Sequence, residues 1–129
     1  MAYEVPGFKL SLVAGESLAS AQYKFVKLNS SGQVIVPTGV TDIPVGVLQN
    51  APASGEIAEV MVCGVSKLQG DADLTKGNQI GTSADGQAAA YVAGTDTTKY
   101  VVGQVLEDNA AAGGLITALI NCANPHRGA

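Results

Sequence analysis

Apolar and polar residues alternate over short segments that are separated by turns rich in Gly, Ser, Asn and Asp. The clearest example is residues 23–28, where Tyr-Lys-Phe-Val-Lys-Leu alternates as a strand with one buried face requires. Residues 29–32 (Asn-Ser-Ser-Gly) supply the side-chain hydrogen bonds and the positive φ of a tight turn. Residues 33–37 return as a second strand, so segment 23–37 is predicted to form a β-hairpin.

The remainder of the chain follows the same pattern. No segment shows a helical apolar period over three turns, and only residues 14–22 are predicted to form one helical turn. Residues 68–77 are polar and rich in turn-forming residues. Further strands are predicted at residues 45–49, 57–63, 79–83, 87–92, 100–106 and 115–121. The fold class is therefore predicted to be mainly β, a small compact barrel or sandwich with at most one short helix.

Two segments of the chain resemble each other. Residues 45–62 and residues 102–120 each read as a strand that begins Val-Gly, a loop of small residues, a glycine and a second strand. Cys63 and Cys122 fall near the end of the second strand in each copy. This pattern predicts two similar hairpins within one domain. Chance similarity between segments rich in Gly and Ala is the alternative.

The first twelve residues differ from the rest. Residues 1–12 contain several apolar residues without a local partner segment, and Pro6 with Gly7 is expected to prevent a continuous strand or helix. The chain is therefore divided into an extended N-terminal arm at 1–12, a β domain at 13–123 and a polar tail at 124–129. The arm is predicted to dock onto another chain; packing on its own domain is the alternative.

Composition suggests that a partner covers part of the surface. Charged residues make up 14% of the chain, whereas an average globular protein has about 25%. The alternative is a bland surface of small Ala, Ser and Thr side chains. The net charge is −4 without any basic cluster, which argues against nucleic-acid contact. The longest apolar stretches, 60–65 and 115–120, are too short to span a bilayer, and the N-terminus does not resemble a secretory signal.

No residue pattern points to catalysis or to a cofactor. The single histidine, His126, lies in the tail, where nothing is expected to fix its orientation. Asp71 with Asp73, and Glu107 with Asp108, are the candidate carboxylate pairs, but all four lie in predicted turns, where acidic residues bond their own backbone. Asp-x-Asp without the rest of a calcium loop is a weak metal signal. We therefore expect no enzymatic activity, no cofactor and no metal site.

The two cysteines, Cys63 and Cys122, are far apart in sequence and have no histidine partner. They are predicted to be free thiols that pack as small apolar side chains. A disulfide between them and a metal site are the alternatives.

Several segments together resemble the head decoration proteins, or capsid cement proteins, of tailed phages. The resemblance covers most of the chain after the arm and concerns layout rather than a catalytic signature. The segments that carry it are Pro44-Val45-Gly46-Val47-Leu48, Val62-Cys63-Gly64-Val65-Ser66-Lys67-Leu68, Leu74-Thr75-Lys76-Gly77-Asn78-Gln79-Ile80, Ala84-Asp85-Gly86, Val102-Gly103-Gln104-Val105-Leu106-Glu107 and residues 110–120.

The resemblance implies a β-tulip-like domain that assembles as a homotrimer on the outside of an icosahedral head, after synthesis in the host cytoplasm. Such trimers sit at three-fold and quasi-three-fold positions, bind the major capsid protein and stabilise the expanded shell against the pressure of packaged DNA. The arm's own apolar composition makes Tyr3, Val5, Pro6, Phe8 and Leu10 the predicted capsid contacts.

Three other functions remain open at this point. A tail or baseplate β domain would share the charge-poor surface. A small β-fold enzyme would need acid–base residues that converge in space. A carbohydrate-binding module is disfavoured because the chain has no Trp and only four Tyr on which sugar rings could stack.

Overall fold

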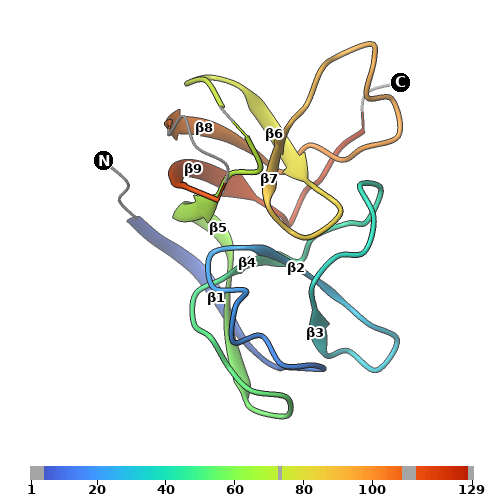
Figure 1. Cartoon of the computed structure of the whole chain (residues 1–129), viewed down its shortest axis with the longest axis vertical. Helices are drawn as coiled ribbons and strands as arrows, with labels where there is room; N and C mark the ends of the chain where they lie inside the picture. The colour runs from blue at the N-terminus through green and yellow to red at the C-terminus, as the bar shows by residue number, and fades with distance from the viewer. Residues whose placement is uncertain (1–4, 73, 109–112, 128–129) are drawn as a thin grey trace.

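The computed structural model describes residues 5–72, 74–108 and 113–127, and these form a mainly β domain (Figure 1). No helix occurs among the described residues, and the predicted helical turn at 14–22 is replaced by turns. The predicted hairpin at 23–37 is confirmed as β2 and β3. The strands are β1 Val5–Val13, β2 Phe25–Leu28, β3 Val34–Ile35, β4 Gly46–Leu48, β5 Ile57–Gln69, β6 Gln79–Thr82, β7 Ala88–Ala90, β8 Gly103–Glu107 and β9 Leu115–Asn121.

All named strand pairs are antiparallel, and they build one curled sheet in the order β3-β2-β4-β5-β9-β8-β6-β7. β1 lies beside β5, outside this path. The predicted small barrel or sandwich is therefore confirmed as a curled half-barrel. In Figure 1, β1 to β4 occupy one half of the molecule, β6 to β9 occupy the other, and the long β5 runs between them.

The two halves have the same topology. From each edge of the sheet toward its centre, the order is a short hairpin, then one strand, then a central strand. The first half has the order β3-β2-β4-β5, and the second half has the order β7-β6-β8-β9. The hairpin registers also match, because Leu28 pairs with Val34 in the first half and Thr82 pairs with Ala88 in the second. The resemblance noticed between two segments thus extends over most of the chain.

The hairpin turns at 29–33 and 83–87 are built alike. The side chain of the first turn residue, Asn29 or Ser83, accepts hydrogen bonds from the backbone N–H groups of the third and fifth residues. The fourth residue is Gly32 or Gly86, with φ of 77° and 90°. Short polar side chains and glycine therefore fix the same turn twice, as their local chemistry predicts.

The predicted Val-Gly hairpins are confirmed as β4–β5 and β8–β9. Their glycines fill equivalent places, since a Cβ added to Gly46 would lie 2.5 Å from the Met61 carbonyl oxygen and one added to Gly103 would lie 2.7 Å from that of Leu119. Only a residue without a side chain permits this approach between strands. Cys63 lies within β5 rather than at its end, because this strand continues to Gln69.

β5 belongs to both halves. Its first part pairs with β1, where Leu12 faces Ala58, and its last part pairs with β9, where Leu68 faces Ile116. The last part of β5 therefore occupies the same place in the second half that β1 occupies in the first. β9 occupies the place of the first part of β5. The predicted end of the strand at residue 63 is wrong, because Gly64 adopts a φ of 133° and pairs with Ile120, which keeps the chain in the sheet.

β1 corrects the description of the N-terminus. We expected Pro6 and Gly7 to prevent a continuous strand, but β1 runs from Val5 to Val13 and pairs with β5. The register shifts between Val5 and Phe8, which accommodates the two residues. Proline is tolerated there because β1 has a neighbouring strand on one side only among the described residues. Most of the predicted arm is thus part of the sheet.

Two clusters of buried side chains form the core. The larger one lies mainly in the second half but includes Phe25, Val47 and Met61 of the first half, each with 0% exposure. The smaller one lies in the first half and includes Leu18 and Val26. The strands of the first half thus contribute residues to both clusters. The smaller cluster comprises Ala14, Leu18, Ala21, Val26, Val34, Leu48, Ala58 and Val60.

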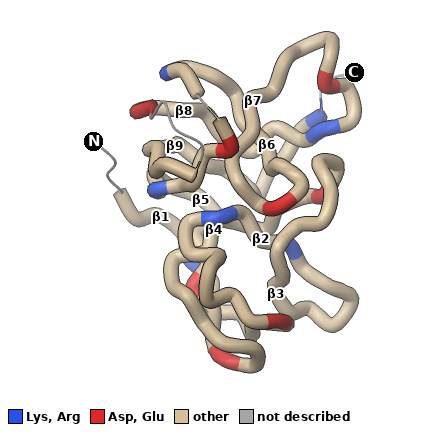
Figure 2. Tube along the Cα trace, viewed as in Figure 1, with Lys and Arg blue, Asp and Glu red and all other residues tan. Residues whose placement is uncertain are grey.

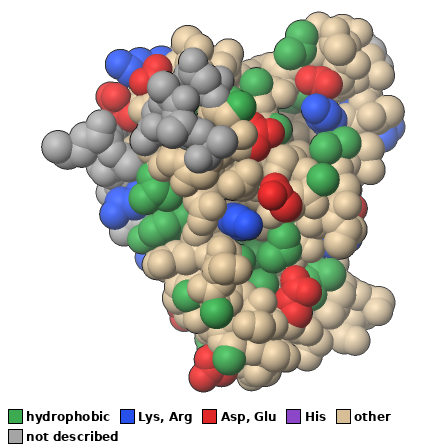
Figure 3. All heavy atoms as spheres, in the orientation of Figure 1, with side chains coloured by type: hydrophobic (Ala, Val, Ile, Leu, Met, Phe, Trp, Pro, Cys, Tyr) green, Lys and Arg blue, Asp and Glu red, His purple; other side chains and the backbone are tan. Residues whose placement is uncertain are grey.

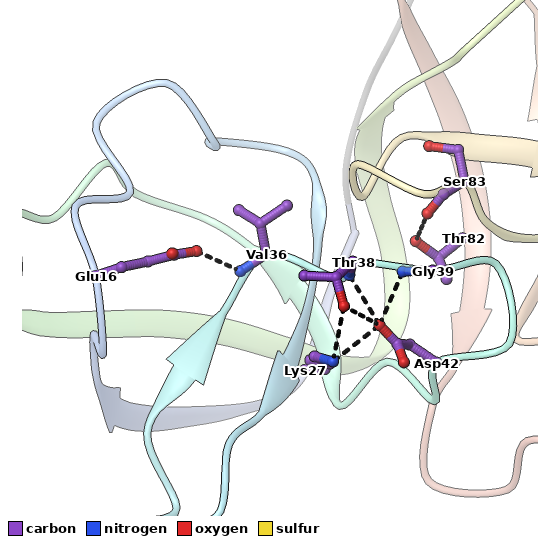
Figure 4. A network of polar contacts seen from close by, with 8 residues as sticks. All are labelled: Glu16, Lys27, Val36, Thr38, Gly39, Asp42, Thr82 and Ser83. Atoms are coloured by element: carbon purple, nitrogen blue, oxygen red, sulfur yellow. Dashed lines mark hydrogen bonds and ion pairs between the residues drawn. The ribbon is translucent and has the colours of Figure 1, made fainter.

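A polar network holds the loop between β3 and β4 against β2 (Figure 4). The Asp42 carboxylate accepts hydrogen bonds from the backbone N–H groups of Thr38 and Gly39 at 2.8 and 3.1 Å. It also forms an ion pair with Lys27 at 2.9 Å. The Lys27 hydrogen bond and the two N–H groups hold the pKa of Asp42 below its usual value.

Candidate interaction surface

Four of the five predicted contact residues lie on β1, and the structure separates them. Val5 and Phe8 are large apolar residues with 57% and 59% exposure, and Pro6 is also exposed. Leu10 is half-buried and packs against the larger core cluster, so less of its side chain is open to a partner than of Val5 or Phe8. Tyr3 lies outside the described residues.

The exposed apolar residues of β1 continue across two more strands. Val5 faces Val65 on β5, and Val65 faces Leu119 on β9, so the three side chains form one row on one face. Phe8 faces Cys63 in the next row. Leu119 is 48% exposed, and Cys63 and Val65 are half-buried. We call these five residues, Val5, Phe8, Cys63, Val65 and Leu119, the β1 patch.

The β1 patch combines two properties of a protein-binding surface. It places exposed apolar side chains next to one another, which is unusual on a surface that meets only water. It also borders the outer edge of β1, where no further strand pairs among the residues that the structure describes. An edge of this kind offers backbone donors and acceptors to an added strand.

The charged side chains of the described residues are scattered rather than gathered into a cluster beside this patch. Lys, Arg, Asp and Glu are dispersed along the trace in Figure 2 and over the face shown in Figure 3. Each ion pair among the described residues joins one cation to one carboxylate, as between Lys76 and Glu107 at 3.8 Å. A contact at the β1 patch would therefore rest on apolar burial and backbone hydrogen bonds rather than on charge.

A shallow cleft of about 270 Å³ lies near one end of the β1 patch, between β8, β9 and the tail. His126 lines it and is held by two backbone hydrogen bonds with Val101, of 2.7 and 3.3 Å. The tail is therefore attached to the domain rather than free. The cleft is lined by Val101, Val102, Gly103, Gln104, Leu119, Ile120, Asn121, Asn124 and His126.

The candidate carboxylates have separate surroundings. Asp71 is half-buried, and desolvation, aided by the charge of Asp85, raises its pKa above the usual value. Glu107 pairs with Lys76, Asp108 is exposed, and Asp73 lies outside the described residues. Within the described ranges, no group of three or more His, Cys, Asp or Glu side chains is placed to hold a metal ion.

Both cysteines are free, as predicted. Burial raises the pKa of the Cys122 thiol to about 12. The thiol of Cys63, in the β1 patch, donates a hydrogen bond to Asn121 Oδ1 at 3.3 Å. Cys122 is therefore a core residue, whereas Cys63 is half-buried, packs against the larger core cluster and is partly open to solvent.

The fold has a counterpart among solved structures. No protein-family model matches the chain, and no curated protein matches its sequence. The chain is similar to the N base of the head fiber protein gp8.5 of bacteriophage phi29, with a TM-score of 0.63 and 17% sequence identity. The match covers 89% of this chain and 94% of the other. At this identity, the comparison establishes a shared fold.

Proposed function

We propose that the chain is a structural protein of a phage head, which binds the major capsid protein on the outer surface and acts without catalysis. The observation that carries the proposal is the fold shared with the base of a phage head fiber over 94% of that base. The residue pattern that resembles phage decoration proteins supports it independently.

We propose further that the chain assembles as a trimer at three-fold and quasi-three-fold positions and stabilises the expanded shell. A protein that binds the expanded shell more tightly than the unexpanded one stabilises it by the difference in binding free energy. Three copies of one contact surface would add avidity, so no single contact needs to be strong.

The β1 patch is the surface that we propose for capsid contact. It contains Val5 and Phe8 of the predicted set, and Cys63, Val65 and Leu119 join them through the strand register. Burial of Phe8 and its neighbours supplies apolar free energy, and the outer edge of β1 can add a strand from the capsid subunit.

The test uses heads of the phage that encodes the chain, stripped of this protein and mixed with purified chain. Phe8→Glu is expected to reduce co-sedimentation with heads at least about tenfold, since a charge would have to be buried. Val92→Glu is the matched control, because Val92 is 54% exposed and lies outside the patch. Equal binding of the two variants would refute the contact surface. Absence of wild-type binding to heads, with binding to tails instead, would refute the proposed function.

A further inference from the structure

The contact between the two halves of the chain is head to tail. Segment 22–25 of the first half seats on the end of β5 and on the β6–β7 turn of the second half. The Tyr23 carbonyl oxygen accepts a hydrogen bond from the Gln69 N–H at 2.8 Å, and the Phe25 N–H donates one to the Gly86 carbonyl oxygen at 2.7 Å. The Lys67 ammonium also lies 5.7 Å from the centre of the Tyr23 ring.

The same seating segment exists once more in the second half, at residues 76–79. Its Gly77 N–H bonds the Val105 carbonyl oxygen at 2.8 Å, as the Tyr23 N–H bonds that of Leu48 at 2.7 Å. The backbone angles agree, with φ of 65° at Tyr23 and 88° at Gly77. Tyr23 is the single non-glycine residue with positive φ among those described. The first half thus keeps the backbone conformation of Gly77 at a residue type that rarely adopts it.

The surface that receives such a segment also exists twice. In the second half it consists of Gln69 and the turn at 83–86. In the first half the matching residues are Val13, which occupies the place of Gln69, and the turn at 29–32. Within the chain, segment 22–25 is seated on Gln69 and the turn at 83–86. The other seating segment, 76–79, and the other receiving surface, Val13 with the turn at 29–32, form no such contact with each other in the described part of the chain.

The unused surfaces are exposed where the used ones are buried. Thr82, which precedes the used turn, is 2% exposed, whereas Leu28 at the same place in the first half is 48% exposed. Val13 is 37% exposed as well. In the unused seating segment, the exposed Gln79 takes the place of Phe25, which is 0% exposed. The receiving surface at the first half thus presents apolar residues to solvent.

We propose that copies of this chain associate head to tail, with residues 76–79 of one copy seated on Val13 and the 29–32 turn of the next. Two hydrogen bonds of the internal contact join backbone atoms only, so their counterparts, Val13 N–H to Gly77 oxygen and Gln79 N–H to Gly32 oxygen, need no particular side chain. The Gly77 oxygen already accepts a hydrogen bond from Gln104 Nε2 at 3.2 Å, and its second lone pair can accept the one from Val13. The contact covers Leu28. A head-to-tail contact between identical copies closes into a ring or continues as a filament.

This proposal names the contact that would hold the copies together and relies on the proposed function only for their number. The test uses the purified full chain in sedimentation velocity over a range of concentrations. The receiving variant carries Val13→Glu and Leu28→Glu, and the seating variant carries Lys76→Glu and Gln79→Glu. Each is expected to weaken self-association at least about tenfold, or ~1.4 kcal/mol. Circular dichroism and the urea midpoint verify that each variant is folded.

Mixing the two variants is the decisive measurement. The receiving variant keeps a normal seating segment, and the seating variant keeps a normal receiving surface. The mixture is therefore expected to form complexes of two copies and none larger at concentrations at which each variant alone is monomeric. A contact between two identical surfaces predicts no such rescue. Gln79→Phe, which restores the residue type of the internal contact, is expected to tighten self-association.

Phe8→Glu serves as the control that separates this contact from capsid binding. It lies in the β1 patch and is expected to lose binding to heads while it keeps wild-type self-association. A wild-type chain that stays monomeric, variants that associate as wild type does, or a mixture that stays monomeric would each overturn the head-to-tail contact. None of these results would remove the proposed capsid binding, which the co-sedimentation assay measures directly.

Discussion

Replacing Gly46 or Gly103 by alanine tests the close approach between paired strands in each half. A Cβ at Gly46 would lie 2.5 Å from both the Met61 carbonyl oxygen and Val60 Cγ1, and one at Gly103 would lie 2.7 Å from the Leu119 carbonyl oxygen. Ordinary contact begins at 3.4 Å, and backbone atoms in the middle of a sheet cannot move away independently. Overpacking of this kind costs about 1–3 kcal/mol.

Gly39→Ala is the matched control, because no atom lies within 4 Å of a Cβ added there. Its free energy of unfolding is expected to stay equal or to rise by less than about 1 kcal/mol. Urea titration followed by circular dichroism gives the three free energies, and calorimetry gives Tm, where a loss of ~2 kcal/mol corresponds to roughly 8 °C. Equal unfolding of Gly46→Ala, Gly103→Ala and Gly39→Ala would refute the argument that the strands approach too closely for a side chain.

Three further predictions concern titratable groups. Lys27 lowers the pKa of Asp42 in the folded protein. The stabilisation that the Asp42 carboxylate contributes is therefore present above its pKa in the unfolded chain and is lost as the pH falls through its pKa in the folded protein. Asp42→Asn should therefore cost about 1 kcal/mol at pH 7 in urea unfolding and little at pH 2, solvent screening included; an equal cost at both pH values would contradict this. The raised pKa of Asp71 has the opposite effect on folding stability, because burial disfavours the charged carboxylate in the folded state. Asp71→Asn should raise the unfolding midpoint at pH 7 and leave it unchanged at pH 2. A thiol reagent at pH 8 should modify Cys63 in the folded protein, and Cys122 only after unfolding; rapid modification of both would show that Cys122 is not buried.

The sequence determined the local elements of this protein. β2, β6 and β9 lie within the strands predicted at 23–28, 79–83 and 115–121, because alternation and turn-forming residues act over a few positions. The Val-Gly segments were recognised as similar because their glycines serve the same close approach. The free thiols were also predicted, since neither cysteine has a partner near it in the sequence.

Only the tertiary structure decided how the N-terminal residues are used. Pro6 and Gly7 disfavour a strand when read locally, but β5 offers β1 a partner, and an edge strand tolerates proline. The same long-range pairing carried β5 past Gly64, where the local pattern predicted an end.

The β1 patch shows the same division. Val5 and Phe8 were predicted as contact residues because an apolar N-terminal segment can be read from the sequence alone. Val65 and Leu119 could not be added, because the register of β1 on β5 and of β5 on β9 places them beside Val5. Leu10, which was predicted with them, is half-buried against the larger core cluster, since the side of a strand that faces the core depends on its register with neighbours. A sequence specifies which residues alternate, and only the assembled sheet decides which of them meet.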